Sequence, residues 1–286
     1  MKPWNQAITG SFAGERAVSS EPGGIVHPEP PWKRIHLEQT SSTQQEARRL
    51  CLLEPGVRRA IRSVRQLSGR GRRGNSWASP EGGLWCTLTL PYPEGPDPFH
   101  NLLVALAALR AVSDGLGVGH HRLALKWPND LIFDGRKWGG VLAEVFGSGK
   151  PQEVLFGIGL NLQISENQLK EQREIPVEAT SILAEFGHSP SPEAVLESIL
   201  SHLDQLLEED RTEVGRERNR LQIAEVLDTI GRRIRWVTHG DEDGEGEATG
   251  IASDGALIVE RNSPTPGRVD QLRSAEISHV RVQNDC

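Results

Sequence analysis

Residues 69–74 consist only of glycine and arginine, in the order Gly-Arg-Gly-Arg-Arg-Gly, and this run constrains the chain more than any other feature. Glycine accepts positive φ angles and lets a backbone approach a ligand closely. Arginine keeps its charge and offers forked donors that match carboxylate or phosphate oxygens. The run therefore predicts an anion-binding loop, with Trp77 within reach of the same ligand.

Arginine and glycine runs also occur as disordered segments that bind nucleic acids, so this alternative has to be weighed. Here the run is short, occurs once and is flanked by strand-like sequence. Residues 60–66 favour a strand before it, and apolar residues alternate from Leu84 to Leu90 after it. We therefore expect a loop between two strands that can close over its ligand.

The composition is that of an acidic globular protein. With 286 residues and a formal net charge of −7, the chain can bury a sizeable core, and its arginine cluster is a local exception. The three cysteines form no CxxC pair, which argues against disulfides, structural zinc and secretion and fits a reducing cytoplasm. No apolar run reaches the ~20 residues that span a bilayer, and the first thirty residues lack the apolar region of a signal peptide.

The patterning predicts three parts. Residues 1–31 read as a flexible tail, too short for a helix-turn-helix module. Residues 32–227 read as one domain of helices and strands, with a hairpin about Asp134-Gly135. Residues 228–286 contain short strands separated by Gly/Asp turns and predict a small β-barrel of SH3-like size. The expected strands of the larger domain lie near residues 35–37 and over 60–66, 84–90, 122–130 and 154–161, with two more in the hairpin of residues 131–145. Its helices are expected over 44–53, 99–116 and 191–207.

The hydroxyls of Ser42 and Thr43 precede a predicted helix. Thr43 and Glu46 have the spacing of a capping box, so the hydroxyls could serve only as a helix cap. Alternatively, the hydroxyls and the free N–H groups of the helix start could face a polar ligand.

Lys126 lies in a strand-like run that we expect to be buried on both sides. A buried lysine needs an anionic partner, so either Asp130 neutralises it or a ligand anion does. The second strand of the following hairpin carries Lys137 and the pair Gly139-Gly140, which indicates close approach of a ligand or of another backbone. Asn161 ends the next apolar strand with a side-chain amide.

These motifs, in this order and spacing, resemble the biotin protein ligases, and the resemblance covers nearly all of the chain after Trp32. It rests on Ser42-Thr43 with the following helix, on Gln66 to Pro80 with the Gly/Arg run and Trp77, on Lys126-Trp-Pro-Asn-Asp130, on Lys137 to Glu144, on Gly157-x-Gly-x-Asn161, and on the pattern from Gly250 to Leu257.

The resemblance implies an α/β (α+β) catalytic domain of the class II synthetase and biotin ligase kind, a mixed sheet flanked by helices, followed by a C-terminal SH3-like β-barrel. It implies that biotin and ATP, with Mg2+, give biotinyl-5'-adenylate and pyrophosphate. A lysine of a biotin carboxyl carrier protein, the acceptor domain of a biotin-dependent carboxylase, then takes the biotinyl group and AMP leaves.

The resemblance also implies roles for single residues. Lys126, Arg70 and Arg72 are the expected catalytic residues, with Lys126 between the biotin carboxylate and the α-phosphate and the two arginines on the phosphate side. No side chain is assigned to the metal, and the protein ligands of Mg2+ stay open. The expected contacts of the biotin ureido ring are Ser42, Thr43, Gln44 and Gln66, those of the nucleotide are Trp77 and Asn161, and the ligand-binding set is completed by Gly69, Gly71, Arg73 and Gly140.

Three positions depart from the pattern of the family. Gln44 stands where Asn is common, Trp138 where an aliphatic residue is common, and Ala275 where Gly is frequent. The first of these concerns a biotin contact and the last a turn of the small barrel.

Other functions fit less well. A lipoate ligase or octanoyltransferase is the nearest alternative, but the Gly/Arg run and the C-terminal barrel favour biotin. The acidic net charge disfavours an RNA-binding protein, and no GxxxxGK motif followed by Ser or Thr exists for a P-loop. Because a winged helix has no room before Trp32, we expect a monofunctional enzyme without DNA binding. The lack of a long apolar run predicts no membrane binding. A homodimer stays open, and the loop of residues 69–77 is expected to be the most mobile catalytic segment without ligand.

Overall fold

The computed structural model describes residues 31–118, 122–147, 152–171, 179–237, 243–263, 265–273 and 276–279. The predicted tail lies outside these ranges apart from Pro31, and Ala275 also lies outside them. No helix among the described residues is long and apolar enough to cross a membrane.

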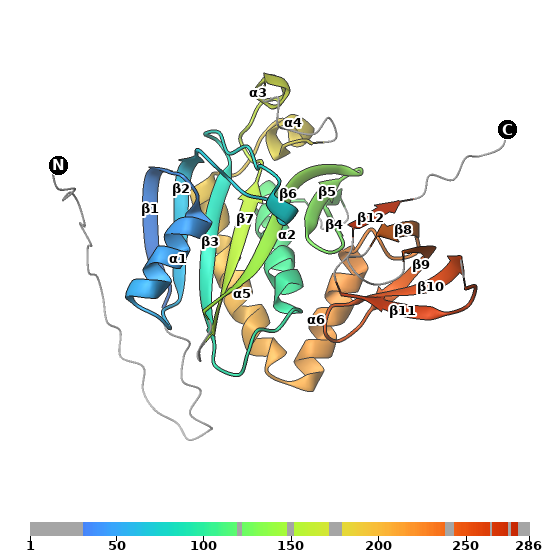
Figure 1. Ribbon diagram of the computed structural model, residues 1–286. Coiled ribbons are helices and arrows are strands. Elements are labelled where there is room, and N and C mark those ends of the chain that lie inside the picture. The colour runs from blue at the N-terminus through green and yellow to red at the C-terminus, as the bar shows by residue number, and fades with distance from the viewer. Residues whose placement is uncertain are drawn as a thin grey trace. The chain divides into compact units, whose positions relative to one another are not determined.

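Seven strands form one mixed sheet in the order β1-β2-β3-β7-β6-β5-β4 (Figure 1). Strands β1 and β2 run parallel, and every other neighbouring pair is antiparallel. The mixed sheet of the prediction is therefore confirmed. The strands are β1 Lys33–Thr40, β2 Arg59–Gln66, β3 Leu84–Tyr92, β4 Ala124–Lys126, β5 Asp130–Phe133, β6 Arg136–Phe146 and β7 Gln152–Leu160.

Helices cover the sheet on both faces (Figure 1). Ala60 of β2 belongs to the large core formed with α2 and α5, whereas Ile61 packs with α1, because successive strand residues point to opposite faces. Helix α5 begins where Ser191 accepts a hydrogen bond from the Ala194 N–H, with proline at its first position. The helices are α1 Thr43–Leu53, α2 His100–Leu116, α3 Glu166–Glu171, α4 Ile182–Phe186, α5 Pro192–Asp210 and α6 Glu213–Val226.

The strand that carries Lys126 is not buried on both sides, so this expectation is wrong. Strand β4 has three residues and forms the edge of the sheet, paired only with β5. Leu123, Leu125 and Trp127 are buried while Lys126 is half-buried. Buried and more exposed side chains therefore alternate along this run, as in a strand with one face in the core. The hairpin about Asp134-Gly135 is confirmed, with both residues at positive φ.

The C-terminal residues form a second, antiparallel sheet of five described strands in the order β11-β10-β9-β8-β12. The short strands of the prediction are thereby confirmed. Among the described residues no pairing joins β11 to β12, so closure into a barrel and the domain limits at residues 227 and 228 remain predictions. The strands are β8 Arg233–Val237, β9 Gly244–Ile251, β10 Leu257–Ser263, β11 Val269–Leu272 and β12 Glu276–His279.

An ion-pair cluster joins the small sheet to the helices. Arg216 of α6 donates to the carbonyl of Ser253 at 2.8 Å and pairs with Asp97 at 2.8 Å and Asp210 at 2.9 Å. Burial opposes ionisation of Asp97, but the hydrogen bonds from Arg216 and the charge of His100 outweigh it and lower the pKa of this carboxyl.

The lowered pKa of Asp97 makes the free energy of unfolding depend on pH. A carboxyl with a depressed folded-state pKa stabilises the protein above its unfolded value of about 3.9, and the contribution is lost as the pH falls through the folded value. We expect the stability difference between the wild type and Asp97→Asn, measured by urea unfolding, to narrow from about pH 5 to about pH 3. A difference that stays constant over this interval would contradict the assignment.

Candidate functional site

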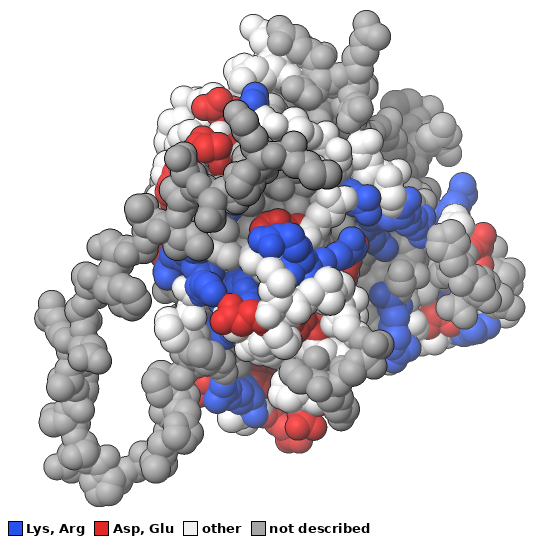
Figure 2. Space-filling model, turned by 60° about the vertical axis from the view of Figure 1, so that its left-hand side comes forward, with Lys and Arg blue, Asp and Glu red and all other residues white. Residues whose placement is uncertain are grey.

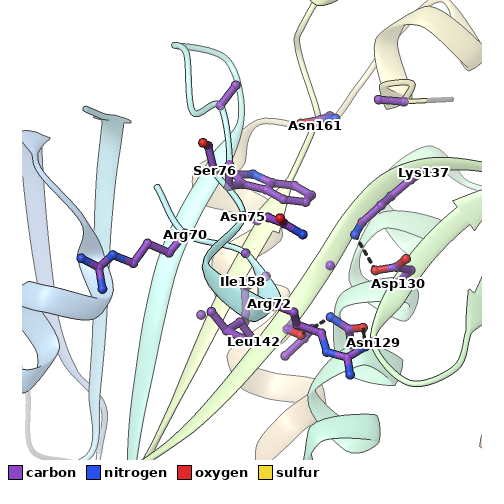
Figure 3. Close-up of a pocket in the computed structure, with 18 of the residues that line it drawn as sticks. Arg70, Arg72, Asn75, Ser76, Asn129, Asp130, Lys137, Leu142, Ile158 and Asn161 are labelled. Carbon is purple, nitrogen blue, oxygen red and sulfur yellow. Dashed lines mark hydrogen bonds and ion pairs between the residues drawn. The ribbon is translucent and has the colours of Figure 1, made fainter. Parts of the chain in front are cut away.

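A cavity of about 680 Å³ lies between the loop that follows β2 and strands β5, β6 and β7 (Figure 3). Of the residues predicted to bind ligand, all but Gly69 and Arg73 line it. The structure thus brings together residues from five separate stretches of the chain. Those in the lining are Ser42, Thr43, Gln44, Gln66, Arg70, Gly71, Arg72, Trp77, Lys126, Gly140 and Asn161.

The Gly/Arg loop folds back on itself as a narrow hairpin. The Trp77 N–H donates to the Gly69 carbonyl at 3.0 Å, and the Gly71 N–H donates to the Asn75 carbonyl at 2.8 Å. A Cβ atom on Gly69 would lie 2.3 Å from the Trp77 carbonyl oxygen, so this position requires glycine. Gly69 therefore shapes the loop rather than touching the cavity.

The three arginines of the loop differ in direction. Arg73 has φ 57° and an exposed side chain at the tip of a 3-10 turn, Arg72–Gly74, which takes it out of the lining. Figure 3 shows the Arg70 guanidinium directed away from the other labelled side chains and that of Arg72 directed toward Asn129. Arg72 Nη1 lies 3.3 Å from Asn129 Oδ1.

The floor of the cavity is a network of neutral polar side chains. Gln66 Oε1 accepts from the Thr43 N–H at 2.8 Å and from the Thr43 hydroxyl at 3.1 Å, and its Nε2 donates to Ser79 Oγ at 2.8 Å. Thr43 Oγ1 also accepts from the Thr87 hydroxyl at 2.8 Å. The helix begins at Thr43 with Ser42 as the capping residue and without a side-chain cap bond, so the predicted capping box is wrong.

Two buried polar atoms of the cavity lack a hydrogen-bond partner among the described residues: Gln44 Oε1 and Trp77 Nε1. Gln44 packs on Gly157, where a Cβ would lie 3.1 Å from its Nε2, and Trp77 packs on Gly159, where a Cβ would lie 2.8 Å from its Nε1. Leaving such a group unpaired costs about 1–3 kcal/mol. A ligand that pairs with these atoms removes this cost.

Asn161 lies in the same wall but is engaged by the protein. Its Nδ2 donates to the Thr180 carbonyl at 2.9 Å and its N–H donates to the Trp138 carbonyl at 2.7 Å. Its side-chain amide therefore fixes the end of β7 against the segment before α4, in addition to any contact with a ligand.

The sequence predicts that Lys137 lies on the second strand of the hairpin but assigns it no contact with a ligand. Its Nζ lies 2.5 Å from Asp130 Oδ1 (Figure 3). The same atom lies 5.0 Å from the centre of the Trp77 ring. Asp130 therefore pairs with Lys137, and the alternative that Asp130 neutralises Lys126 by a salt bridge is wrong. Among the described residues, no carboxylate forms a salt bridge with Lys126.

The balance of charge in the lining favours an anionic ligand. Arg70, Arg72, Lys126 and Lys137 line the cavity, and Asp130 is its carboxylate among the described residues. On the face that Figure 2 draws, Lys and Arg gather in clusters separated by Asp, Glu and uncharged residues. The whole chain carries a formal net charge of −7. The excess of cations is local to the site.

Two other groups of side chains could be reactive: the Cys86 thiol and the cluster of Asp97, His100 and Asp210. Burial raises the pKa of the Cys86 thiol in the cavity wall to about 12, so it is a neutral thiol at pH 7 rather than a nucleophile. Asp97, His100 and Asp210 lie close enough to hold a metal ion, but the Arg216 guanidinium pairs with both carboxylates. This cluster is therefore an ion-pair network.

Comparisons with known proteins define the class first. The model described as the Biotin/lipoate A/B protein ligase family matches residues 36–161, and the model described as the Biotin protein ligase C terminal domain matches residues 229–280. The sheet and its cationic cavity are thus those of a biotin or lipoate ligase domain.

Individual relatives narrow the class. A biotin–acetyl-CoA-carboxylase ligase of Paracoccus denitrificans is 38% identical over 169 residues, covering 56% of this chain and 67% of that protein. The bifunctional ligase/repressor BirA of Bacillus subtilis is 28% identical over 247 residues, covering 85% and 73%. The structure of a biotin protein ligase from Aquifex aeolicus in complex with biotin and ATP has a TM-score of 0.68 at 25% identity and covers 86% of this chain and 99% of its own. The chain belongs to the biotin protein ligase family.

Proposed function

We propose that this protein activates biotin with ATP as biotinyl-5'-adenylate, releasing pyrophosphate, and transfers the biotinyl group to a lysine of a biotin carboxyl carrier protein. One observation carries the proposal: a floor of neutral polar groups and a cluster of cations line the same cavity. Membership of the family supports it, as do related structures solved with biotin and ATP or with biotinyl-5-AMP.

The polar floor suits the ureido ring of biotin, which carries both donors and an acceptor. Gln44 Oε1, which is buried and has no partner among the described residues, can accept from a ureido N–H. The Ser42 hydroxyl is buried beside it and is not used as a helix cap, so it can donate to the ureido carbonyl. Because Gln66 fixes Thr43 in place, this end of the site is organised before biotin arrives.

The cationic end suits the first half-reaction. A carboxylate oxygen of biotin attacks the α-phosphorus of ATP while the bond to pyrophosphate breaks, so two anions must meet. Lys137, Lys126 and Arg72 supply positive charge that offsets this repulsion and stabilises the charge developing on phosphorus. We assign the position between carboxylate and phosphate to Lys137 together with Lys126, because Trp77 and Asp130 hold the Lys137 ammonium at the cavity wall.

The second half-reaction needs no protein nucleophile. The amine of the acceptor lysine attacks the acyl carbon, AMP leaves and an amide forms. The loop of residues 69–77 can exclude water from the adenylate, and Trp77 can pack on it. Positioning and charge supply the catalysis.

Mg2+ fits this site in a limited way. Asp130 is the carboxylate of the described lining, and Mg2+ is usually held by one or two carboxylates together with substrate phosphates and water. When bound, the ion would offset the charge of the triphosphate. The proposal further keeps the enzyme monofunctional and cytoplasmic, without DNA binding, and leaves a homodimer open.

The proposal is tested by supplying biotin, MgATP and a carrier domain and measuring the mass of the carrier. We expect one added biotinyl group, and none when ATP is omitted. Lipoate and octanoate are offered in parallel. Transfer of either of these in place of biotin would identify the alternative, a lipoate ligase or octanoyltransferase.

The two lysines give a graded prediction. Lys137→Met and Lys126→Met should each slow biotin-dependent pyrophosphate release by about 10²-fold or more, because the transition state loses a counter-charge. Lys137→Met should be the slower of the two, since it also leaves the Asp130 carboxylate uncompensated beside the anionic substrates. The exposed Lys33→Met is the matched control. Wild-type rates in both lysine variants of the site would refute their assigned role.

The two glycines of β7 separate the two ends of the site. Gly157→Ala crowds Gln44 and should raise the KM for biotin, whereas Gly159→Ala crowds Trp77 and should raise the KM for ATP. We expect each change to be about tenfold for one substrate and below about twofold for the other. Both KM values rising together in both variants would show that the two ends are not separate.

A further inference from the structure

Three hydrogen bonds hold the residues on either side of Lys126 from the C-terminal part of the chain. The Asp228 N–H donates to the Leu125 carbonyl at 2.9 Å, and the Trp127 N–H donates to Thr229 Oγ1 at 3.0 Å. The Trp127 indole N–H donates to the Gly255 carbonyl at 3.0 Å. The two bonds of Trp127 are buried and form out of contact with water, and the three bonds together fix β4 at the sheet edge.

The third acceptor belongs to the turn of residues 252–256, which joins β9 to β10 and is held firmly. Gly255 has φ 81°, and a Cβ on it would lie 3.2 Å from Leu102 Cδ1 and 3.4 Å from Phe99 Cα at the start of α2. Within the turn, the Ala252 N–H donates to the Ala256 carbonyl at 2.8 Å. The Gly255 carbonyl is therefore a fixed acceptor on a turn that packs against the start of α2.

Trp127 is also connected to Arg72 of the loop, through Asn129. Two residues further on, Asn129 accepts from Arg72 through Oδ1 and donates from Nδ2 to the Val141 carbonyl at 2.9 Å. A second cavity of about 290 Å³ lies between the turn and this pair, lined by Gly255, Trp127, Asn129 and Arg72. A continuous series of contacts thus runs from the turn to Lys126 on one side and to Arg72 on the other.

We propose that the turn of residues 252–256 positions the cations of the adenylation site, and that Trp127 is the positioning residue through which it acts. The inference rests on the proposed function. Because charge stabilisation of a transition state depends on where the cations lie, a displaced β4 slows the chemical step. Biotin affinity is set elsewhere, by Gln44, Thr43 and Gln66, which are held by bonds to α1, β2 and β6.

The alternative is that Trp127 only docks the small sheet onto the larger one. Arg220 provides a matched control, since its Nη1 donates to the Ile251 carbonyl at 3.1 Å at the end of β9. This bond joins α6 to the same sheet without involving residues 125–129. Losing it weakens docking and leaves Lys126 where it is.

The experiment compares Trp127→Phe, which keeps a ring but removes the indole N–H, with Arg220→Met. Steady-state pyrophosphate release is measured below the unfolding midpoint of each variant. Trp127→Phe should lower kcat about tenfold or more while the KM for biotin stays within about twofold. Arg220→Met should leave kcat at the wild-type value. An unchanged kcat in Trp127→Phe, or an equal loss in Arg220→Met, would overturn the inference.

Two further measurements address the turn itself. Gly255→Ala leaves every hydrogen-bonding group in place but pushes the turn from α2, so it should lower kcat as Trp127→Phe does, and the double variant should be no slower than the worse single one. Amide hydrogen exchange of residues 122–130 should increase in both variants and stay unchanged in Arg220→Met. Hydrogen exchange does not require turnover, so it tests whether the turn holds β4 independently of activity. A wild type that released no pyrophosphate would overturn the proposed function and leave the exchange result valid.

Discussion

The repulsion between positive side chains gathered in one cavity is the constraint on which the rest of the structure depends. A site that joins a carboxylate to a phosphate has to keep cations with few carboxylates near them before any ligand is bound. Four cationic side chains and one carboxylate line this cavity in the described part of the chain. The backbone around them has to be held by other means. Two buried hydrogen bonds of Trp127 and half-buried ones of Asn129 and Gln66 do this.

Much of the fold could be predicted because it follows local patterns. Alternation from Leu84 to Leu90, the turn at Asp134-Gly135 and the Ser-Pro start of α5 each specify their element within a few residues. The position of β4 could not be predicted in this way. The sequence around Lys126 shows an apolar run, but whether a strand lies inside a sheet or at its edge depends on which strands pair, and that is decided by distant residues.

The same distinction applies to the site. The Gly/Arg loop predicts an anion-binding segment from composition alone, and the structure places Arg70 and Arg72 in the cavity lining. Arg73 differs from them because one residue in left-handed backbone conformation turns its side chain outward. The role of Lys137 in the site could not be predicted from the sequence. Its place beside Asp130 depends on how β5 pairs with β6, where a register shift between Leu131 and Ile132 sets Gly140 opposite Asp130. Neither strand alone shows such an irregularity. Cross-strand pairing is therefore the information that the sequence lacks at this point.

The two ends of the cavity are built on different supports. Thr43 bonds to Gln66, and Gln44 donates to the Leu142 carbonyl, so the polar end depends on α1, β2 and the middle of β6. The cations lie on the loop, on β4 and on β6, and bonds from residues 228, 229 and 255 reach β4 from the C-terminal part of the chain. A substitution in the small sheet can therefore change the chemical step without changing the recognition of biotin. This separation gives the C-terminal sheet a reason to be joined to the catalytic sheet by buried bonds beside Lys126 rather than only by a flexible linker.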